Sequence, residues 1–190
     1  MIPYSQAKSI IARFIPEPIS EDIPFDQSCN RVLSQNIFSP FPQPLFDNSA
    51  MDGFAVRWQD TQGAAQNTPV PLTVTDTVPA GSPSDKTVLK DECMRIMTGA
   101  KIPQGANAVI MVENTSGFES DTVQIYNEVK EKQNIRFAGE EIPSGSLIIP
   151  HDTVITPAEI GIAATFGMEK LPVFRKPVIS VFGLGDELLE

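Results

Sequence analysis

The sequence predicts a mixed α+β chain of several domains, and three observations support this fold class. Residues 3–15 show the spacing of an amphipathic helix. Residues 51–143 are rich in Val, Ile, Thr and Phe between Gly, Pro, Asn and Asp, which is typical of short strands. Residues 178–182 are almost wholly apolar and run into a glycine turn, as the first strand of a parallel α/β domain does. We therefore expect a final α/β domain to begin near Val178 and to be truncated in this chain.

The first helix is expected to present one apolar stripe and to stop at prolines. Pro3 suits its first turn, and Pro16 and Pro18 end it. The apolar residues of the stripe recur at helical spacing: Ala7, Ile10, Ile11, Phe14 and Ile15. A second short helix is expected over residues 26–36, with three apolar side chains facing inward: Val32, Leu33 and Ile37.

A proline-rich passage, residues 39–44, is expected to cross into a second, β-rich domain. Its prolines favour a stiff, extended path. Candidate strands follow at residues 54–58, 71–77, 108–113 and 122–129. Short strands at this spacing predict a small antiparallel sheet or barrel.

The pattern changes again after Gly145. Two short strands are expected at residues 147–149 and 153–155, on either side of a turn at residues 150–152. A further strand is expected around Val173.

Between these strands the sequence carries strong helix signals. Thr156 has the position of an N-cap, Pro157 follows it, and Glu159 stands three residues after Thr156, which is the spacing of a capping box. We expect this helix to reach about Phe166 and to end at Gly167.

Composition narrows the class of protein. Lys+Arg number 14 and Asp+Glu number 24, so the net charge is −10 and nucleic acid is not an expected partner. Cys29 and Cys93 form no CxxC pair, which argues against a structural zinc site and favours free thiols in a reducing cytoplasm. No apolar run has the length of a membrane span, and the N-terminus lacks the pattern of a secretory signal. The single histidine, His151, excludes mechanisms that need two.

The most unusual segment is residues 46–56, where small and polar residues precede a strand. Asp52 and Gly53 are expected to form a tight turn in which Gly53 is free to take positive φ. The Asp52 carboxylate would then stand at the mouth of the strand. The alternative is an Asx-type turn without chemistry.

A second segment, residues 95–103, places a Thr98–Gly99 turn after a strand, between Arg95 and Lys101. Such a turn can offer a hydroxyl and backbone N–H groups to an oxyanion. The alternative is a β-turn with solvated charges.

A third segment, residues 134–141, contains Arg136, a bidentate donor suited to phosphate or another oxyanion. Glu140 and Glu141 could hold Arg136 in place or bind Mg²⁺ through water. The alternative is a surface ion pair that contributes little.

In a fourth segment, Asp186 and Glu187 follow the last predicted strand, at the sheet edge where α/β domains bind ligands. The alternative is a pair of acids at a helix N-terminus.

Taken together, these segments are similar to a known family. Residues 46–56 closely resemble the signature of the molybdopterin molybdotransferases of the MoeA and gephyrin type. The other matching segments follow in the family's order: residues 95–100, 107–113, 134–136 with 139–140, and 185–188. The resemblance covers the whole chain.

The resemblance implies an elongated α/β dimerisation domain with an inserted, barrel-like β-rich lobe. Residues 20–38 and 146–176 would form the dimerisation domain, and residues 39–145 the lobe. Residues 1–19 would hold a helix that packs on the truncated molybdopterin-binding α/β domain, whose first strand lies in residues 177–190.

The resemblance also implies an activity. The family takes adenylylated molybdopterin and molybdate, releases AMP, and leaves molybdenum on the dithiolene with Mg²⁺ assisting. A homodimer is implied, with each site shared between subunits. The molybdopterin adenylyltransferase is a further partner compatible with the resemblance.

Site residues carry over from the family motifs. Four positions are implied to be catalytic: Asp52, Thr98, Arg136 and Glu187. Seven are implied to bind the cofactor: Ser49, Met51, Gly53, Gly99, Gly139, Glu140 and Asp186. Two are implied to contact the metal: Asp52 and Glu141.

The chain departs from the family pattern at a few positions. Gly183 and Leu184 stand where Ser and Thr are usual, and Glu141 stands where Asp is usual. Phe137 and Ala138 replace positions that are often basic. This fragment is expected to be inactive alone, and two alternatives stay open: a non-catalytic dimeric scaffold, or a module that binds molybdate or pterin.

Overall fold

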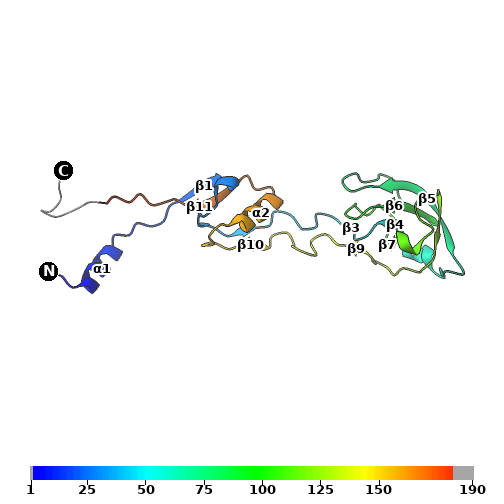
Figure 1. Cartoon of the computed structure of the whole chain (residues 1–190), viewed down its shortest axis with the longest axis horizontal. Helices are drawn as coiled ribbons and strands as arrows, with labels where there is room; N and C mark the ends of the chain where they lie inside the picture. Colours follow the sequence, from blue (N-terminus) through cyan, green and yellow to red (C-terminus); the bar gives the residue numbers. More distant parts are fainter. Residues whose placement is uncertain (1, 182–190) are drawn as a thin grey trace. The chain divides into compact units, whose positions relative to one another are not determined.

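The computed structural model describes residues 2–181. Over this range the chain forms two compact units, whose helices and strands are labelled in Figure 1. One unit, Ser39–Ser146, is continuous in sequence and is called the lobe below. The other, called the flanking unit, is built from the segments before and after the lobe.

The lobe is built on a curled five-stranded sheet with the order β7-β4-β6-β5-β8 (Figure 1). Its strands are β4 (Gly53–Val56), β5 (Val70–Val78), β6 (Glu92–Ile96), β7 (Ala108–Met111) and β8 (Thr122–Ile125). The four predicted strands are confirmed, and β6 is the strand expected before the Thr98–Gly99 turn. The prediction of an antiparallel sheet is wrong for one pair, because β5 and β6 run parallel.

Both faces of this sheet are covered by apolar side chains. All four residues of β4 are buried, since β4 lies between β6 and β7. Phe54 and Val56 pack in one core cluster, and Ala55 between them packs in the other with Met94 and Val109. The side chains alternate between the two clusters because successive residues of a strand point to opposite faces of the sheet. Two single-turn 3-10 helices, Trp58–Thr61 and Val112–Asn114, follow β4 and β7.

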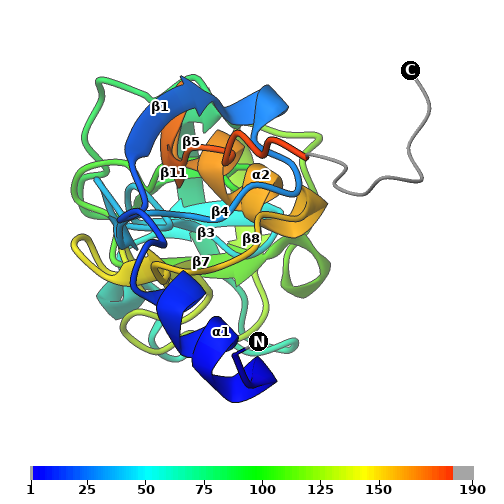
Figure 2. The same cartoon turned by 90° about the vertical axis from the view of Figure 1, so that its left-hand side faces the viewer.

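The flanking unit contains two small antiparallel pairs and one packed helix. β1 (Ser20–Pro24) pairs with β11 (Lys170–Phe174), and β2 (Ile37–Phe38) pairs with β10 (Leu147–Ile149). Figure 2 shows β1 beside β11 with α2 (Pro157–Thr165) next to them. One core holds the buried apolar side chains of this unit: Ile149 of β10, Ala163 of α2, Leu171 and Val173 of β11, and Leu33 and Ile155 from connecting segments.

Helix α2 confirms the capping signals in the sequence. The Thr156 side chain accepts from the Ala158 N–H at 3.2 Å, and Glu159 Oε2 accepts from the Thr156 N–H at 2.8 Å. Pro157 occupies the first turn, and Gly167 takes φ +66° just after the helix. These signals are local, so the helix start and stop could be predicted without its tertiary contacts.

The helix expected over residues 26–36 is wrong. Only a 3-10 turn, Phe25–Gln27, forms there, and Asn30 has φ +63°, which breaks any helix. Leu33 is fully buried as expected, but through an antiparallel bridge to Val173. A partner far along the chain thus overrides the local periodicity. Likewise residues 153–155 form no strand, and only an isolated bridge joins Val154 to Val32.

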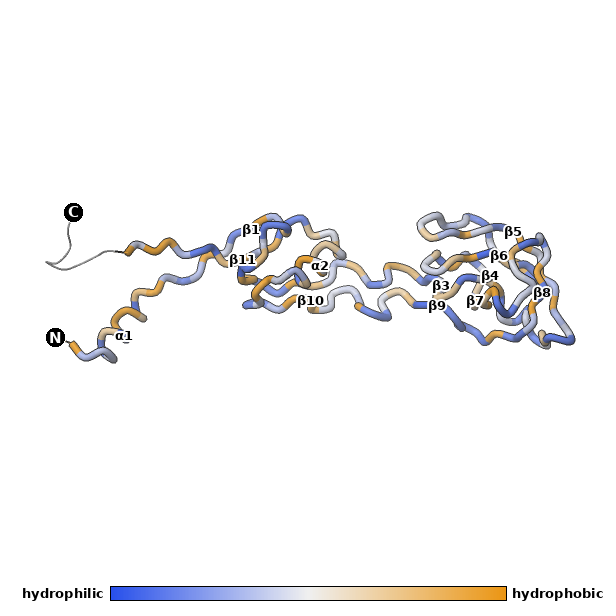
Figure 3. The backbone as a smooth tube through the Cα atoms, viewed as in Figure 1, coloured by the Kyte–Doolittle hydropathy of each residue, from blue (hydrophilic) through white to orange (hydrophobic). Residues whose placement is uncertain are grey.

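Helix α1 (Tyr4–Ala12) confirms the first predicted helix, but none of its residues is buried. Of the predicted apolar stripe, Ile11 in the helix is 67% exposed and Phe14, just after the helix, is 80% exposed. Residues 177–181 form no strand, and Figure 3 shows this segment as another apolar stretch. A strand requires a neighbour for its backbone groups, and the described residues offer it none. Residues 182–190 lie outside the described part of the chain.

No helix within residues 2–181 is both long and apolar enough to cross a membrane.

Candidate functional site

A two-residue strand of the lobe, β3 (Asn48–Ser49), joins three of the four segments singled out in the sequence. On one side it pairs antiparallel with β9 (Ile135–Arg136), so that Asn48 stands opposite Arg136. On the other side Asn48 forms an antiparallel bridge with Lys101. The Gly99 N–H also donates to the Ser49 carbonyl at 2.8 Å. The first, second and third segments therefore lie side by side.

Asp52 and Thr98 are in direct contact. Asp52 Oδ1 accepts from the Thr98 N–H at 2.7 Å and from the Thr98 Oγ1–H at 2.8 Å. Both bonds favour the charged carboxylate, the backbone bond more strongly, and they lower the pKa of Asp52 below its ordinary value. The result is an ionised, exposed carboxylate whose direction is set by the Thr98–Gly99 turn.

Gly53 is required for a reason other than the predicted one. It is not among the glycines with positive φ, and it begins β4. A Cβ at this position would lie 1.9 Å from the Ile110 carbonyl oxygen of the neighbouring strand β7. Close approach of two backbones, and not a left-handed turn, therefore excludes a side chain next to Asp52.

The Arg136 loop is held by carboxylates that accept backbone bonds. Asp47 Oδ1 accepts from the Ala138 N–H, and Glu140 Oε2 accepts from the Phe137 N–H, both at 2.8 Å. Glu140 therefore fixes the loop and does not pair with Arg136. Glu141 Oε1 lies 3.8 Å from Arg136 Nη1, and both side chains are 53% exposed. Such a loose surface pair leaves the guanidinium available to a ligand.

The serine and the two glycines of these segments shape the backbone of the site. Ser49 is fully buried, and its Oγ–H donates to the Met51 carbonyl at 2.5 Å. Gly99 and Gly139 have φ +80° and +75°, a conformation that residues with a side chain rarely adopt. Both glycines therefore permit the turns that carry the polar residues. Met51 is 39% exposed next to Asp52.

Arg95 belongs to the structure of the sheet. Its Nε–H donates to the Phe118 carbonyl at 3.2 Å, and its Nη2–H donates to the Ser120 carbonyl at 2.7 Å. The Arg95 charge is thus neither freely solvated, as one interpretation held, nor directed at Asp52 and Thr98.

Sequence reasoning assigned no role to two residues that assemble this region. Asp47 ties the first segment to the third through the Ala138 N–H, and Asn48 stands between Lys101 and Arg136. The run of small polar residues before β4 indicated an unusual turn in the sequence. It did not indicate which other segments Asp47 and Asn48 contact.

Four residues that were singled out in the sequence lie outside the described part of the chain: Gly183, Leu184, Asp186 and Glu187. Within residues 2–181 no group of three or more His, Cys, Asp or Glu residues is arranged to hold a metal ion.

Burial raises the pKa of the Cys93 thiol to about 12, so this thiol is not a reactive nucleophile.

The fold and the site define a class: an α+β protein with an inserted β-rich lobe that presents a carboxylate, a hydroxyl and a guanidinium. The family described as MoeA N-terminal region (domain I and II) matches residues 2–167, and the chain belongs to this family. The resemblance noted in the sequence is therefore confirmed.

Similar proteins agree with this assignment. The molybdopterin molybdenumtransferase of Staphylococcus epidermidis (strain RP62A) is 40% identical over 169 residues, covering 89% of this chain and 40% of that protein. That of Staphylococcus aureus (strain N315) is 39% identical over 168 residues, covering 88% and 40%. The chain thus spans about 40% of the length of these curated relatives.

Two solved structures are also similar. The molybdopterin biosynthesis moeA protein of Pyrococcus horikoshii OT3 has a TM-score of 0.79 and 34% identity, over 91% of this chain and 46% of that one. A second crystal structure of the Pyrococcus protein has a TM-score of 0.83 and 30% identity, over 93% and 45%.

Proposed function

We propose that this chain supplies part of the site of a transferase in molybdenum cofactor synthesis. The reaction inserts molybdate into adenylylated molybdopterin and releases AMP. One observation carries the proposal: β3 brings the Asp52–Thr98 pair and Arg136 to the same region of the lobe. The names of the relatives support the choice of reaction.

Each group has a task that its surroundings suit. Arg136 presents a planar donor to an oxyanion of the substrate, and its loose pairing with Glu141 lets a ligand replace that partner. Thr98 holds Asp52 in one orientation through two hydrogen bonds to Oδ1. The other oxygen, Oδ2, has no hydrogen-bond partner among the described residues and can face the ligand. Glu187 and Asp186 are proposed to contribute from outside the described range.

The donor set is compatible with Mg²⁺ assistance. Mg²⁺ binds through one or two carboxylates, substrate phosphates and water, and does not require an all-protein cage. Asp52 provides an ionised carboxylate with a free oxygen, and Glu141 is a second acid on the Arg136 loop. When bound, the ion neutralises charge on the substrate phosphates.

The assembly and location are also proposals. We propose that the protein acts in the cytoplasm as a homodimer that receives its adenylylated substrate from the molybdopterin adenylyltransferase. The two cysteines are unpaired, as expected in a reducing compartment. Sedimentation of the full-length protein as a clean monomer would contradict the dimer.

The decisive experiment measures molybdate-dependent AMP release from adenylylated molybdopterin, with Mg²⁺, by the full-length gene product. Asp52→Ala should lower the rate roughly 100-fold, as loss of one preorganised electrostatic contact does. Glu119→Ala removes an exposed acid elsewhere on the lobe and should leave the rate unchanged. No AMP release by a folded wild-type protein would reject the transferase and leave a scaffold or a binding module.

A further inference from the structure

Lys101 lies in register with Arg136 on the two sides of Asn48. Asn48 pairs with Arg136 in the β3–β9 ladder and with Lys101 in the bridge on its other side. Directly paired residues of antiparallel strands present their side chains to the same face. Lys101, Asn48 and Arg136 therefore form one row across three neighbouring chain segments.

The neighbours of this row show which face it occupies. Three apolar residues pack in one of the two core clusters of the lobe: Ala100, Ile102 and Ile135. Each is adjacent in sequence to Arg136 or Lys101, and successive side chains of extended backbone point to opposite faces. Lys101 and Arg136 therefore point away from the core. Neighbouring segments lie about 5 Å apart, which places their Cα atoms roughly 10 Å from each other.

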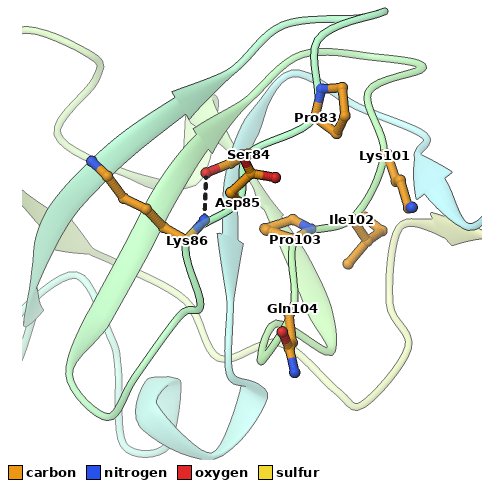
Figure 4. A pocket seen from close by; sticks show the side chains of 8 residues that line it. All are labelled: Pro83, Ser84, Asp85, Lys86, Lys101, Ile102, Pro103 and Gln104. Carbon is orange, nitrogen blue, oxygen red and sulfur yellow. Dashed lines mark hydrogen bonds between the residues drawn. The ribbon is translucent and has the colours of Figure 1, made fainter.

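The Lys101 ammonium is available to a ligand. Among the described residues, no hydrogen bond or ion pair involves its Nζ. Lys101 also lines a surface pocket of about 460 Å³, which holds the acid Asp85 and to which Asn48 and Arg136 do not contribute. Lys86 also lines this pocket, but Figure 4 shows its side chain reaching away, where Nζ donates to the Thr75 carbonyl at 2.8 Å. The Lys101 ammonium is therefore without a partner among the described residues, and Lys101 stands two residues after Gly99 of the Thr98–Gly99 turn.

We infer that Lys101 and Arg136 together bind a ligand with two linked anionic groups, of the diphosphate ester class, above Asn48. The inference rests on the proposed function and adds a binding residue to that site. One guanidinium can bind a single oxyanion through two parallel hydrogen bonds. Two cationic side chains that extend from different backbone positions can instead bind two linked phosphates. Asn48, which is only 8% exposed and donates to the Phe46 carbonyl, forms the uncharged floor between them. In a chain of net charge −10, such a local pair decides where an anion binds.

The test is calorimetric titration of the purified chain with inorganic pyrophosphate and with orthophosphate at low ionic strength. Lys101→Met should weaken pyrophosphate binding about tenfold, the effect of one charge-assisted contact, and Lys101→Arg should retain it. The same Lys101→Met change should alter orthophosphate binding by less than about threefold, because Arg136 alone serves one group. Lys90→Met, an exposed lysine before β6 at the far end of that strand, is the matched control and should bind as wild type.

Two results would overturn the inference. One is wild-type pyrophosphate affinity in Lys101→Met, with Trp58 fluorescence showing that the variant is folded. The other is absence of pyrophosphate binding by the wild-type chain. Neither result touches the proposed reaction, which is judged separately by AMP release from the full-length protein. Failure of that assay together with intact pyrophosphate binding would instead leave a diphosphate-binding module.

Discussion

The Asp52 carboxylate receives both of its hydrogen bonds from one residue, Thr98, and these bonds determine the pH at which it ionises. The Thr98 backbone and hydroxyl bonds lower its pKa, the backbone bond contributing more. Because the folded pKa is depressed, the bonds stabilise the folded state above the unfolded pKa, and this stabilisation is lost as the pH falls through the folded value. We predict that Thr98→Val raises the pKa of Asp52 part of the way back, since only the hydroxyl bond is removed. Carboxyl-carbon NMR titration measures this directly.

The matched control for this titration is Asp76. Its pKa is lowered mainly by the Ser84 hydroxyl, elsewhere in the lobe, so Thr98→Val should leave it unchanged. An unchanged Asp52 titration in the variant would show that the hydroxyl bond does not form in solution.

Gly53 is the second single residue for which we predict the effect of a substitution. In Gly53→Ala the new Cβ would meet the Ile110 carbonyl oxygen at 1.9 Å, and this obstacle is backbone in the centre of the sheet. We expect a loss of about 3 kcal/mol in the free energy of unfolding of the lobe, typical of severe overpacking. Urea unfolding followed by Trp58 fluorescence reports on the lobe, because Trp58 packs against its core. Gly161→Ala, where a Cβ meets nothing within 4 Å, should leave the Trp58 transition in place.

At the scale of elements, the start of α2 is fixed by the capping box. Thr156→Ala removes the acceptor for the Ala158 N–H, which should lower the stability of the flanking unit by about 1 kcal/mol. Faster hydrogen exchange of the Ala158 amide would locate the effect at the first turn. Thr165→Ala serves as control, since that hydroxyl donates to the Gly161 carbonyl inside the helix and caps no N–H group. Equal exchange in the wild type and Thr156→Ala would contradict the assignment.

The elements differ in how far sequence alone could predict them. The start of α2 and the strands of the lobe were predictable because caps and β-branched runs act locally. Residues 26–36 were not, since the bridge from Leu33 to Val173 joins positions far apart in the chain. The parallel pairing of β5 with β6 is equally non-local. Periodicity identifies which face of a segment is apolar, but it does not identify what that face packs against.

The same distinction applies to the candidate site. Residue types and turn chemistry pointed to Asp52, Thr98 and Arg136 one by one, but each also had an interpretation without chemistry. Their proximity depends on β3, whose two residues pair with segments more than 50 and 80 positions away. Only the family resemblance linked the three segments before the structure did. The reason for Gly53 was misjudged because the strand that approaches it is also distant in sequence.

At the scale of the whole molecule, the lobe has the features of an independent folding unit. It carries its own two core clusters, and its ends meet: the Ser39 N–H donates to the Ser146 carbonyl and the Gly145 N–H donates to the Ser39 carbonyl, both at 2.8 Å. A segment whose termini already pair loses little when it is excised. The flanking unit lacks this property, since its core joins residues from before and after the lobe.

We therefore predict that residues 39–146 alone fold cooperatively, with the same urea midpoint by Trp58 fluorescence as in the whole chain. They should also keep the pyrophosphate affinity of the whole chain, because Lys101, Asn48 and Arg136 all lie within this segment. Residues 39–106 form the control: they lack β7 and β8, whose Ile110, Val123 and Ile125 complete the core around Phe54, and they should not fold. A broad, non-cooperative transition for residues 39–146 would show that the lobe depends on the flanking unit. In that case the row of Lys101, Asn48 and Arg136 would be a property of the whole chain and not of the lobe.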